Sequence, residues 1–209
     1  MFRLSPLIAL ALLLAACGGS SKTSVPPPTT AAATTAPATT APATTSPSGP
    51  GALKGEAQQA ATGDVPDNQV FLTFRNGSAG YSIKYPEGWA QQGSGNQVTF
   101  RDKNNIVRIV VSSGGPFTAA EVKADVAALK GATVTKGPDP VTIGGQPAFK
   151  VTYSTESAPN AVTGKRVKLV VDRYYLWHGG KRAIIELATP EGVDNVDAYR
   201  MMITSFKWH

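Results

Sequence analysis

The chain has 209 residues, a formal net charge of +6 and a single cysteine, so it cannot be a disulfide-linked scaffold. The positive excess belongs to the part expected to fold, where Asn68 to His209 carries 17 Lys and Arg against 11 Asp and Glu. Those roughly 140 residues are the size of one domain and can bury a core that needs no metal or cofactor.

A lipoprotein signal peptide is predicted over residues 1 to 16. It has a basic start at Arg3, an apolar run from Leu7 to Ala16, and the sequence Leu14-Ala15-Ala16-Cys17. Ten apolar residues are too short for a membrane span, which needs about 20. We expect cleavage before Cys17 and attachment of acyl chains such as palmitate to its thiol. An ordinary secretory signal cut near Ala16 is the alternative.

Residues 17 to 67 are predicted to be the lipidated cysteine followed by a disordered tether. From Ser20 to Gly51 the chain consists almost entirely of Pro, Thr, Ala, Ser and Gly, with repeated Thr-Thr-Ala-Pro-Ala steps from Thr34 to Ala43. Such a segment buries little apolar surface, and its prolines favour extended polyproline II. The composition also suits O-glycosylation. This predicts a protein held on the extracytoplasmic face of the cell membrane, in the cell envelope.

The folded domain, residues 68 to 209, is expected to begin with antiparallel strands. Alternating apolar residues predict strands around 70–75 and 81–85, separated by a turn at Asn76-Gly77. Trp89 is then expected to pack against the sheet. Two further strands, 98–103 and 106–112, are expected to be joined by a turn at Asn104-Asn105, because asparagine tolerates positive φ.

A helix is predicted to follow from Thr118 to Gly131. Thr118 and Glu121 form a capping box, and Phe117 is placed to contact Val122 as a hydrophobic staple. A later helix, capped near Asp194, should present one apolar stripe. That stripe consists of Val196, Tyr199, Met202, Ile203 and Phe206.

Strands resume between the two helices. After 141–143 and 149–153, two long strands over 166–177 and 182–188 are expected to pair through a turn at Gly179-Gly180. That turn sets Leu176 opposite Ala183, Tyr174 opposite Ile185 and Arg173 opposite Glu186. Both faces of this hairpin are apolar, which indicates a sheet covered on both sides. The fold class expected is α+β, with an antiparallel sheet between helical layers.

Three motifs stand out in the domain, namely Gly80-Tyr81-Ser82-Ile83-Lys84-Tyr85-Pro86-Glu87-Gly88-Trp89, Ile143-Gly144-Gly145-Gln146-Pro147-Ala148 and Met202-Ile203-Thr204-Ser205-Phe206. Together they resemble the PsbP-like family. The resemblance covers about residues 70 to 208. It implies an α/β/α sandwich with a central antiparallel sheet flanked by helices. It implies no enzyme activity, since members range from photosystem subunits to bacterial lipoproteins. The family's metal-binding residues have no match in this chain.

The sequence offers few candidates for catalysis or metal binding. His178 and His209 lack the spacing of a metal pair, and His178-Gly179-Gly180 lacks the serine elbow of an esterase. Arg173 with Glu186, or Asp172 on the other face, is interpreted as a structural cross-strand pair with a polar site as the alternative. Asn76-Gly77-Ser78 matches the glycosylation pattern, but a tight turn explains it.

The candidate interaction surface is the cationic cluster Lys165, Arg166 and Lys168. It could meet an anionic envelope component, either lipid head groups or a wall polymer, although a solvated surface explains it as well. We therefore expect a non-enzymatic, membrane-anchored binding or accessory domain with no nucleic-acid partner. A protein partner is an alternative to the anionic envelope component. The alternatives are a ligand carrier or hydrolase-like protein with a pocket, and a photosystem-associated subunit.

Overall fold

A computed structural model describes residues 63 to 209. The predicted signal peptide, Cys17 and nearly all of the tether lie outside these described residues. In the part described, no helix is long and apolar enough to cross a membrane.

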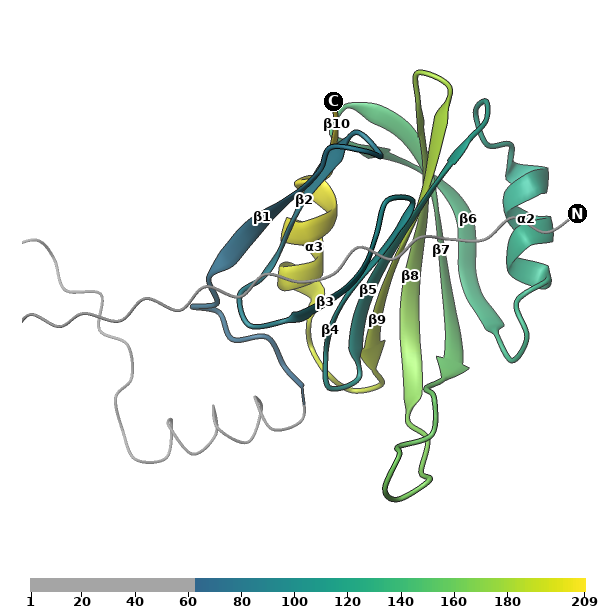
Figure 1. Ribbon diagram of the computed structural model, residues 1–209. Coiled ribbons are helices and arrows are strands. Elements are labelled where there is room, and N and C mark those ends of the chain that lie inside the picture. The colour runs from purple at the N-terminus through teal and green to yellow at the C-terminus, as the bar shows by residue number, and fades with distance from the viewer. Residues whose placement is uncertain (1–62) are drawn as a thin grey trace, which may run out of the picture. The chain divides into compact units, whose positions relative to one another are not determined.

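The domain is built mainly from antiparallel strands (Figure 1). A seven-stranded sheet has the order β3-β4-β5-β9-β8-β7-β6, and a three-stranded sheet has the order β1-β2-β10. In chain order the elements are β1 (Phe71–Asn76), β2 (Tyr81–Pro86), β3 (Ala90–Ser94), β4 (Gln97–Asp102), β5 (Asn105–Ser113), α2 (Ala119–Ala127), β6 (Thr133–Ile143), β7 (Gln146–Glu156), β8 (Lys168–His178), β9 (Lys181–Pro190), α3 (Val196–Thr204) and β10 (Lys207–Trp208).

The β8–β9 hairpin has the predicted register. Leu176 pairs with Ala183, Tyr174 with Ile185 and Arg173 with Glu186. The hairpin occupies the middle of the large sheet. Its alternate residues belong to two different cores, one on each face, so both faces are covered.

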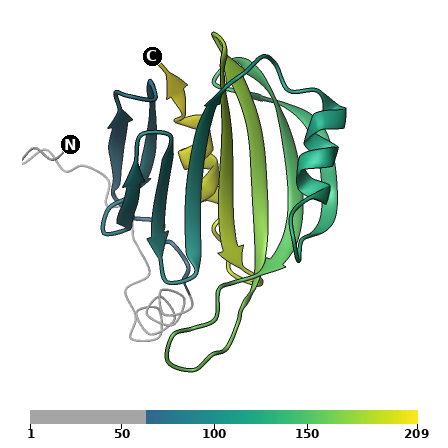
Figure 2. The same cartoon turned by 45° about the vertical axis from the view of Figure 1, so that its right-hand side comes forward.

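Each face of the large sheet packs against one helix. On one face, α3 and the small sheet contribute Tyr199 and Ile83 to a shared core. On the other face, α2 packs through Val122 and Val126. Figure 2 shows the two helices on opposite sides of the large sheet. The fold is therefore α+β, with mostly antiparallel sheets and two helices in the described part of the chain.

The turn between β4 and β5 differs from the prediction. Asp102 pairs with Asn105, so the turn residues are Lys103 and Asn104, and Lys103 takes the positive φ of 52°. Asn105 is 1% exposed and begins β5. Its amide is used inside the fold, which is why the chain turns one residue earlier than predicted.

Two strands were not fully anticipated. β3 has the sequence Ala-Gln-Gln-Gly-Ser, all exposed, and lies at one edge of the large sheet. β6 forms the opposite edge and begins at Thr133, well before the predicted 141–143, with register irregularities between Val134 and Asp139. Neither β3 nor β6 before Val141 has the apolar alternation by which strands are recognised.

The start of α2 agrees with the prediction, whereas α3 begins one residue later than predicted. The capping box at Thr118 and Glu121 is confirmed. The N-cap of α3 is Asn195 and its side chain makes no capping bond, whereas Asp194 accepts a hydrogen bond from the Val196 amide at 3.3 Å. In the predicted stripe, Val196 is exposed and the other four residues are buried.

The start of the described chain is fastened to the domain. The side-chain amides of Asn105 and Asn195 donate to the Gly63 carbonyl, and the Val65 amide donates to Asn195 Oδ1 at 2.8 Å. Asn195 also donates to Asn105 Oδ1 at 3.1 Å. Residues 63 to 65, which the sequence analysis places in the tether, therefore make specific contacts with the fold.

Candidate functional site

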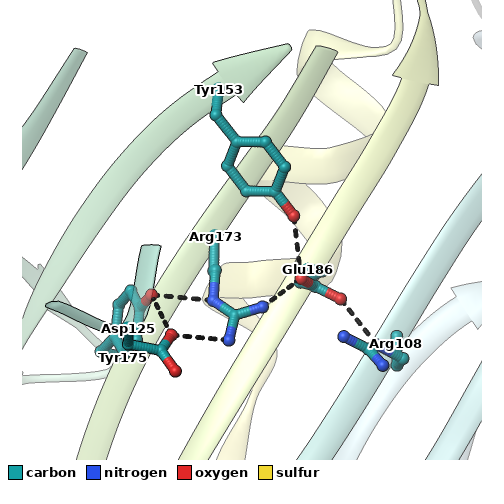
Figure 3. A network of polar contacts seen from close by, with 6 residues as sticks. All are labelled: Arg108, Asp125, Tyr153, Arg173, Tyr175 and Glu186. Atoms are coloured by element: carbon teal, nitrogen blue, oxygen red, sulfur yellow. Dashed lines mark hydrogen bonds and ion pairs between the residues drawn. The ribbon is translucent and has the colours of Figure 1, made fainter. Parts of the chain in front are cut away.

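A chain of charged side chains crosses three neighbouring strands on the face covered by α2 (Figure 3). Arg108 on β5, Glu186 on β9 and Arg173 on β8 lie side by side, because the register pairs Glu186 with both arginines. Arg173 and Glu186 are buried, with 6% and 12% of their side chains exposed. This is the cross-strand pair predicted from the hairpin.

Each charged group in this network has several partners. Glu186 binds Arg173, accepts from Arg108 Nε at 2.6 Å, and accepts from the Tyr153 hydroxyl at 2.9 Å. Arg173 also contacts Asp125 of α2 at 2.7 Å and donates to the Tyr175 hydroxyl at 2.8 Å. The network thereby ties α2 to the sheet.

The network favours the charged form of Glu186 and the neutral form of two tyrosines. Burial would raise the pKa of Glu186, but Arg108 and Arg173 outweigh it and keep that pKa below its usual 4.5. Burial raises the pKa of the Tyr153 and Tyr175 phenols, and the adjacent carboxylates raise it further. The pKa values of Glu186, Tyr153 and Tyr175 are thus shifted away from neutral pH, so we interpret the network as structural.

A hollow that we call the α2 hollow adjoins this network at Tyr175 and has a volume of about 520 Å³. Its floor comes from three adjacent strands in which Pro140 pairs with Phe149, and Phe149 with Tyr175. The loop that leads into α2 forms its wall. The lining residues are Pro116, Phe117, Pro140, Val141, Thr142, Pro147, Ala148, Phe149, Tyr175 and Trp177.

The wall of the α2 hollow is fixed by Arg182. Its guanidinium lies 4.4 Å from the centroid of the Phe117 ring, donates to the Gly115 and Pro116 carbonyls, and contacts Glu121 at 3.1 Å. The Trp177 indole donates to the Gly114 carbonyl at 3.1 Å. The loop is therefore bound at several points, and the hollow is preformed.

A second hollow of about 380 Å³ lies on the opposite face, beside α3. Unlike the α2 hollow it has charged side chains in its lining, where the ion pair of Lys150 and Asp172, 2.8 Å apart, lies together with Tyr174 and Arg200. Thr152 donates to Asp172 at 2.7 Å. Asp172, the alternative polar residue in the sequence analysis, is thus engaged in its own pair.

The predicted cationic cluster lies at the start of β8 and in the loop before it. Lys168 pairs with Glu191 at 2.7 Å, while Arg166 donates to the Ser157 carbonyl at 2.8 Å and lies 3.9 Å from Glu156. Lys165 is exposed. Neighbouring acids therefore offset part of the positive charge that the sequence places here.

The other residues singled out in the sequence have structural positions. His178 is exposed at the end of β8, and His209 contacts Ser82 at 3.0 Å. Asn76 is 5% exposed, and its Oδ1 accepts from Ser78 and Ala79 while its amide donates to Gly95, so the turn interpretation accounts for it. Trp89 is 8% exposed and belongs to the core, as predicted. Residues 63 to 209 contain no cluster of three or more potential metal ligands among His, Cys, Asp and Glu.

Sequence reasoning did not identify the α2 hollow. The sequence does place apolar side chains on one face of each strand, because Pro147 and Phe149 are two residues apart on one strand and Tyr175 and Trp177 on another. Such alternation also predicts core packing, and only the tertiary structure shows that these side chains line a hollow beside the loop that leads into α2.

Comparison with known proteins gave structural likenesses alone. No family model and no curated protein matches the chain. A Bacteroides thetaiotaomicron protein is similar with a TM-score of 0.45 at 15% identity over 66% of this chain, which spans only 48% of that protein. Cyanobacterial PsbP from Synechocystis has a TM-score of 0.44 at 16% identity, covering 71% of this chain and 99% of that one. LpqN of Mycobacterium tuberculosis, described as involved in cell envelope biogenesis, has a TM-score of 0.39 at 15% identity, covering 68% of this chain and 91% of that one. These likenesses do not assign the chain to a family.

Proposed function

We propose that this protein is a lipid-anchored, extracytoplasmic lipoprotein whose PsbP-like domain binds an uncharged, apolar ligand and does not transform it. The observation that carries the binding proposal is the lining of the α2 hollow. Aromatic rings and prolines dominate that lining, and the described residues that form it include no carboxylate, imidazole, thiol, ammonium or guanidinium group. A charged ligand would lose its hydration there without gaining a counter-ion.

The same lining argues for binding over catalysis. Hydrolysis by a nucleophile requires a hydroxyl or thiol with a base in hydrogen-bond reach. The hydroxyls of this hollow belong to Thr142 and Tyr175, and the latter donates to Asp125 at 2.7 Å while its own pKa is raised by burial. Apolar surface removed from water contributes about 25 cal/mol per Å² to binding, which is the force that this hollow offers.

An uncharged fluorescent probe tests the binding proposal. We would titrate N-phenyl-1-naphthylamine into the chain from Gly18 to His209, which keeps the tether and every residue from 63 onward. Phe149→Glu and Pro147→Glu should each weaken binding about tenfold or more, because they place a charge against the ligand. Leu72→Glu on β1 is the control, since Leu72 is apolar, 39% exposed and remote from the hollow in the sequence and on the other sheet. Equal affinity for the probe in the native chain, the two hollow variants and the control would refute the proposal.

The membrane anchor is proposed on the sequence alone. Cys17 is the only cysteine and follows Leu14-Ala15-Ala16, so Cys17→Ala should abolish incorporation of labelled fatty acid and leave a precursor that is not processed at this position. Incorporation of label into the variant would contradict the anchor. Binding of an anionic envelope component at Lys165, Arg166 and Lys168 stays a prediction.

A further inference from the structure

The hollow beside α3, which we call the α3 hollow, combines apolar side chains with charged ones. Its volume is about 380 Å³, and the charged side chains among its described lining residues are Lys150, Asp172 and Arg200. Lys150 and Asp172 come from the neighbouring strands β7 and β8, whereas Arg200 comes from α3. Two cations and one carboxylate give this lining an excess of positive charge, which favours an anion.

The carboxylate in this lining is already engaged by the protein. Asp172 Oδ1 accepts from the Thr152 hydroxyl at 2.7 Å, and Asp172 Oδ2 lies 2.8 Å from Lys150 Nζ. Burial would lower the pKa of Lys150, but Asp172 outweighs it and keeps that pKa above its usual 10.5. The ammonium is therefore charged at neutral pH. Because an ammonium has three N–H donors, its contact with Asp172 leaves donors for a further acceptor.

Arg200 is the cation that a ligand can recruit at least cost. Its Nη1 lies 3.1 Å from Asp197 Oδ1, but 68% and 87% of these two side chains are exposed. An ion pair so open to water contributes little free energy, so little is lost when the guanidinium turns toward a ligand. A guanidinium also binds an oxyanion through two N–H groups at once.

Three further polar side chains of the lining are committed to the fold. The Tyr199 hydroxyl donates to the Ala188 carbonyl at 2.6 Å. The Asn195 amide donates to the Thr189 hydroxyl at 2.8 Å, and Thr189 donates to Asn105 Oδ1 at 3.1 Å. The strongest donors that remain for a ligand are thus the two cations, which favours an anion over an uncharged polar molecule.

Apolar side chains form another part of the α3 hollow. Val170, Leu187 and Val193 line it, together with Val196 in the first turn of α3. Val196 is 61% exposed, although it lies on the apolar stripe that the sequence predicts for this helix. An apolar ligand group in the hollow would remove the Val196 side chain from water, which is favourable. The lining therefore suits a molecule with an anionic group and an apolar body.

We propose that the α3 hollow binds a small monoanionic amphiphile, such as an alkyl carboxylate. Its anionic group pairs with Lys150 and Arg200, and its apolar part contacts Val196, so that a few charged groups orient a ligand held mainly by apolar contacts. This site lies on the other face of the large sheet from the α2 hollow and has the opposite preference for charge. It adds to the binding of an uncharged ligand and does not depend on it.

Two fluorescent probes with the same aromatic body test this proposal. The probe 8-anilinonaphthalene-1-sulfonate is N-phenyl-1-naphthylamine with one sulfonate added, and we would titrate it into the chain from Gly18 to His209. Arg200→Glu should weaken its binding about tenfold, because a cation that pairs with the sulfonate becomes an anion. Lys123→Glu makes the same change of charge at an exposed position of α2, and this control should leave the affinity nearly unchanged.

A second variant tests the apolar side of the site. Val196→Glu should also weaken binding of the sulfonate probe, whereas Leu72→Glu, at another exposed apolar residue outside this lining, should not. Decanoate should displace the sulfonate probe from the native chain. Decan-1-ol, which has the same alkyl chain and no charge, should displace far less.

The outcomes separate this site from the α2 hollow. The uncharged probe should bind Arg200→Glu as it binds the native chain, and Phe149→Glu should leave binding of the sulfonate probe intact. A sulfonate probe that does not bind saturably, or that is weakened equally by Arg200→Glu and Lys123→Glu, would overturn the proposal. Weakening by Phe149→Glu and not by Arg200→Glu would locate the probe in the α2 hollow and overturn it as well.

Discussion

At the scale of single residues, Arg173 links the two central strands to α2. It reaches Glu186 on β9 and Asp125 on α2 from a position where only 6% of its side chain is exposed. A buried ion pair contributes little net stability compared with an apolar pair, but removal of one partner leaves the other charge buried and uncompensated.

Arg173→Met should therefore lower the free energy of unfolding by about 3 to 5 kcal/mol. Urea denaturation measures the change. Lys168→Met is the matched control, because Lys168 pairs with Glu191 at a similar distance but both side chains are more than half exposed, and its effect should stay below about 1 kcal/mol. Similar losses in the two variants would contradict a special role for the buried pair.

The network also predicts a dependence of stability on pH. Because the folded pKa of Glu186 lies below the ordinary 4.5, the unfolded chain binds more protons as the pH falls. The stability that Glu186 contributes is complete at pH values above its ordinary pKa of 4.5, and it is lost as the pH falls through the folded pKa. The difference in unfolding free energy between the native chain and Glu186→Gln should shrink on acidification, and a difference that grows would show that the sign is wrong.

At the scale of elements, α2 is short and depends on its cap. Glu121 accepts from the Thr118 amide at 2.8 Å, and the Thr118 hydroxyl accepts from the Glu121 amide at 3.2 Å. The nine residues of α2 then cover only part of the sheet, which leaves the α2 hollow beside its first turn.

Thr118→Ala should cost about 1 kcal/mol of stability, because one amide of the first helical turn loses its acceptor. Thermal unfolding followed by circular dichroism measures this. Thr163→Ala, in the exposed loop before β8, should leave the melting temperature nearly unchanged. A cost as small as that of the control would mean that water replaces the cap without penalty.

The elements that the sequence predicted well are those specified by neighbouring residues. The β8–β9 register follows from the Gly179-Gly180 turn and the apolar pattern on both sides of it, and the cap of α2 follows from Thr118 and Glu121. Asn105 was misassigned because its partners, Gly63 and Asn195, lie 42 and 90 residues away. The α2 hollow was missed for the same reason, since its lining runs from Pro116 to Trp177.

At the scale of the whole molecule, the folded domain is fastened to its N-terminal extension at Gly63. Asn105 and Asn195 are 1% and 2% exposed, and both use the Gly63 carbonyl as an acceptor. Gly63, the first described residue, is thus held in a fixed position beside Asn105 and Asn195.

A chain beginning at residue 68 should unfold more readily than one beginning at residue 63, by about 1 to 3 kcal/mol, because buried amides lose their acceptor. Chemical denaturation of both chains measures the difference. Asn195→Ala should cost much less in the shorter chain than in the longer one, since its partner is already missing. Equal costs in both would show that the Gly63 contact contributes nothing.

The central claim, that the α2 hollow is the ligand site, is tested most directly by the NMR signals of the three tryptophan indoles during titration with N-phenyl-1-naphthylamine. Trp177 lines the hollow, whereas Trp89 lies in the core and Trp208 in β10. Single Trp→Phe variants assign the signals. We predict that the Trp177 signal shifts saturably while those of Trp89 and Trp208 stay in place. Saturable binding that shifts Trp208 or Trp89 and leaves Trp177 unmoved would contradict the claim.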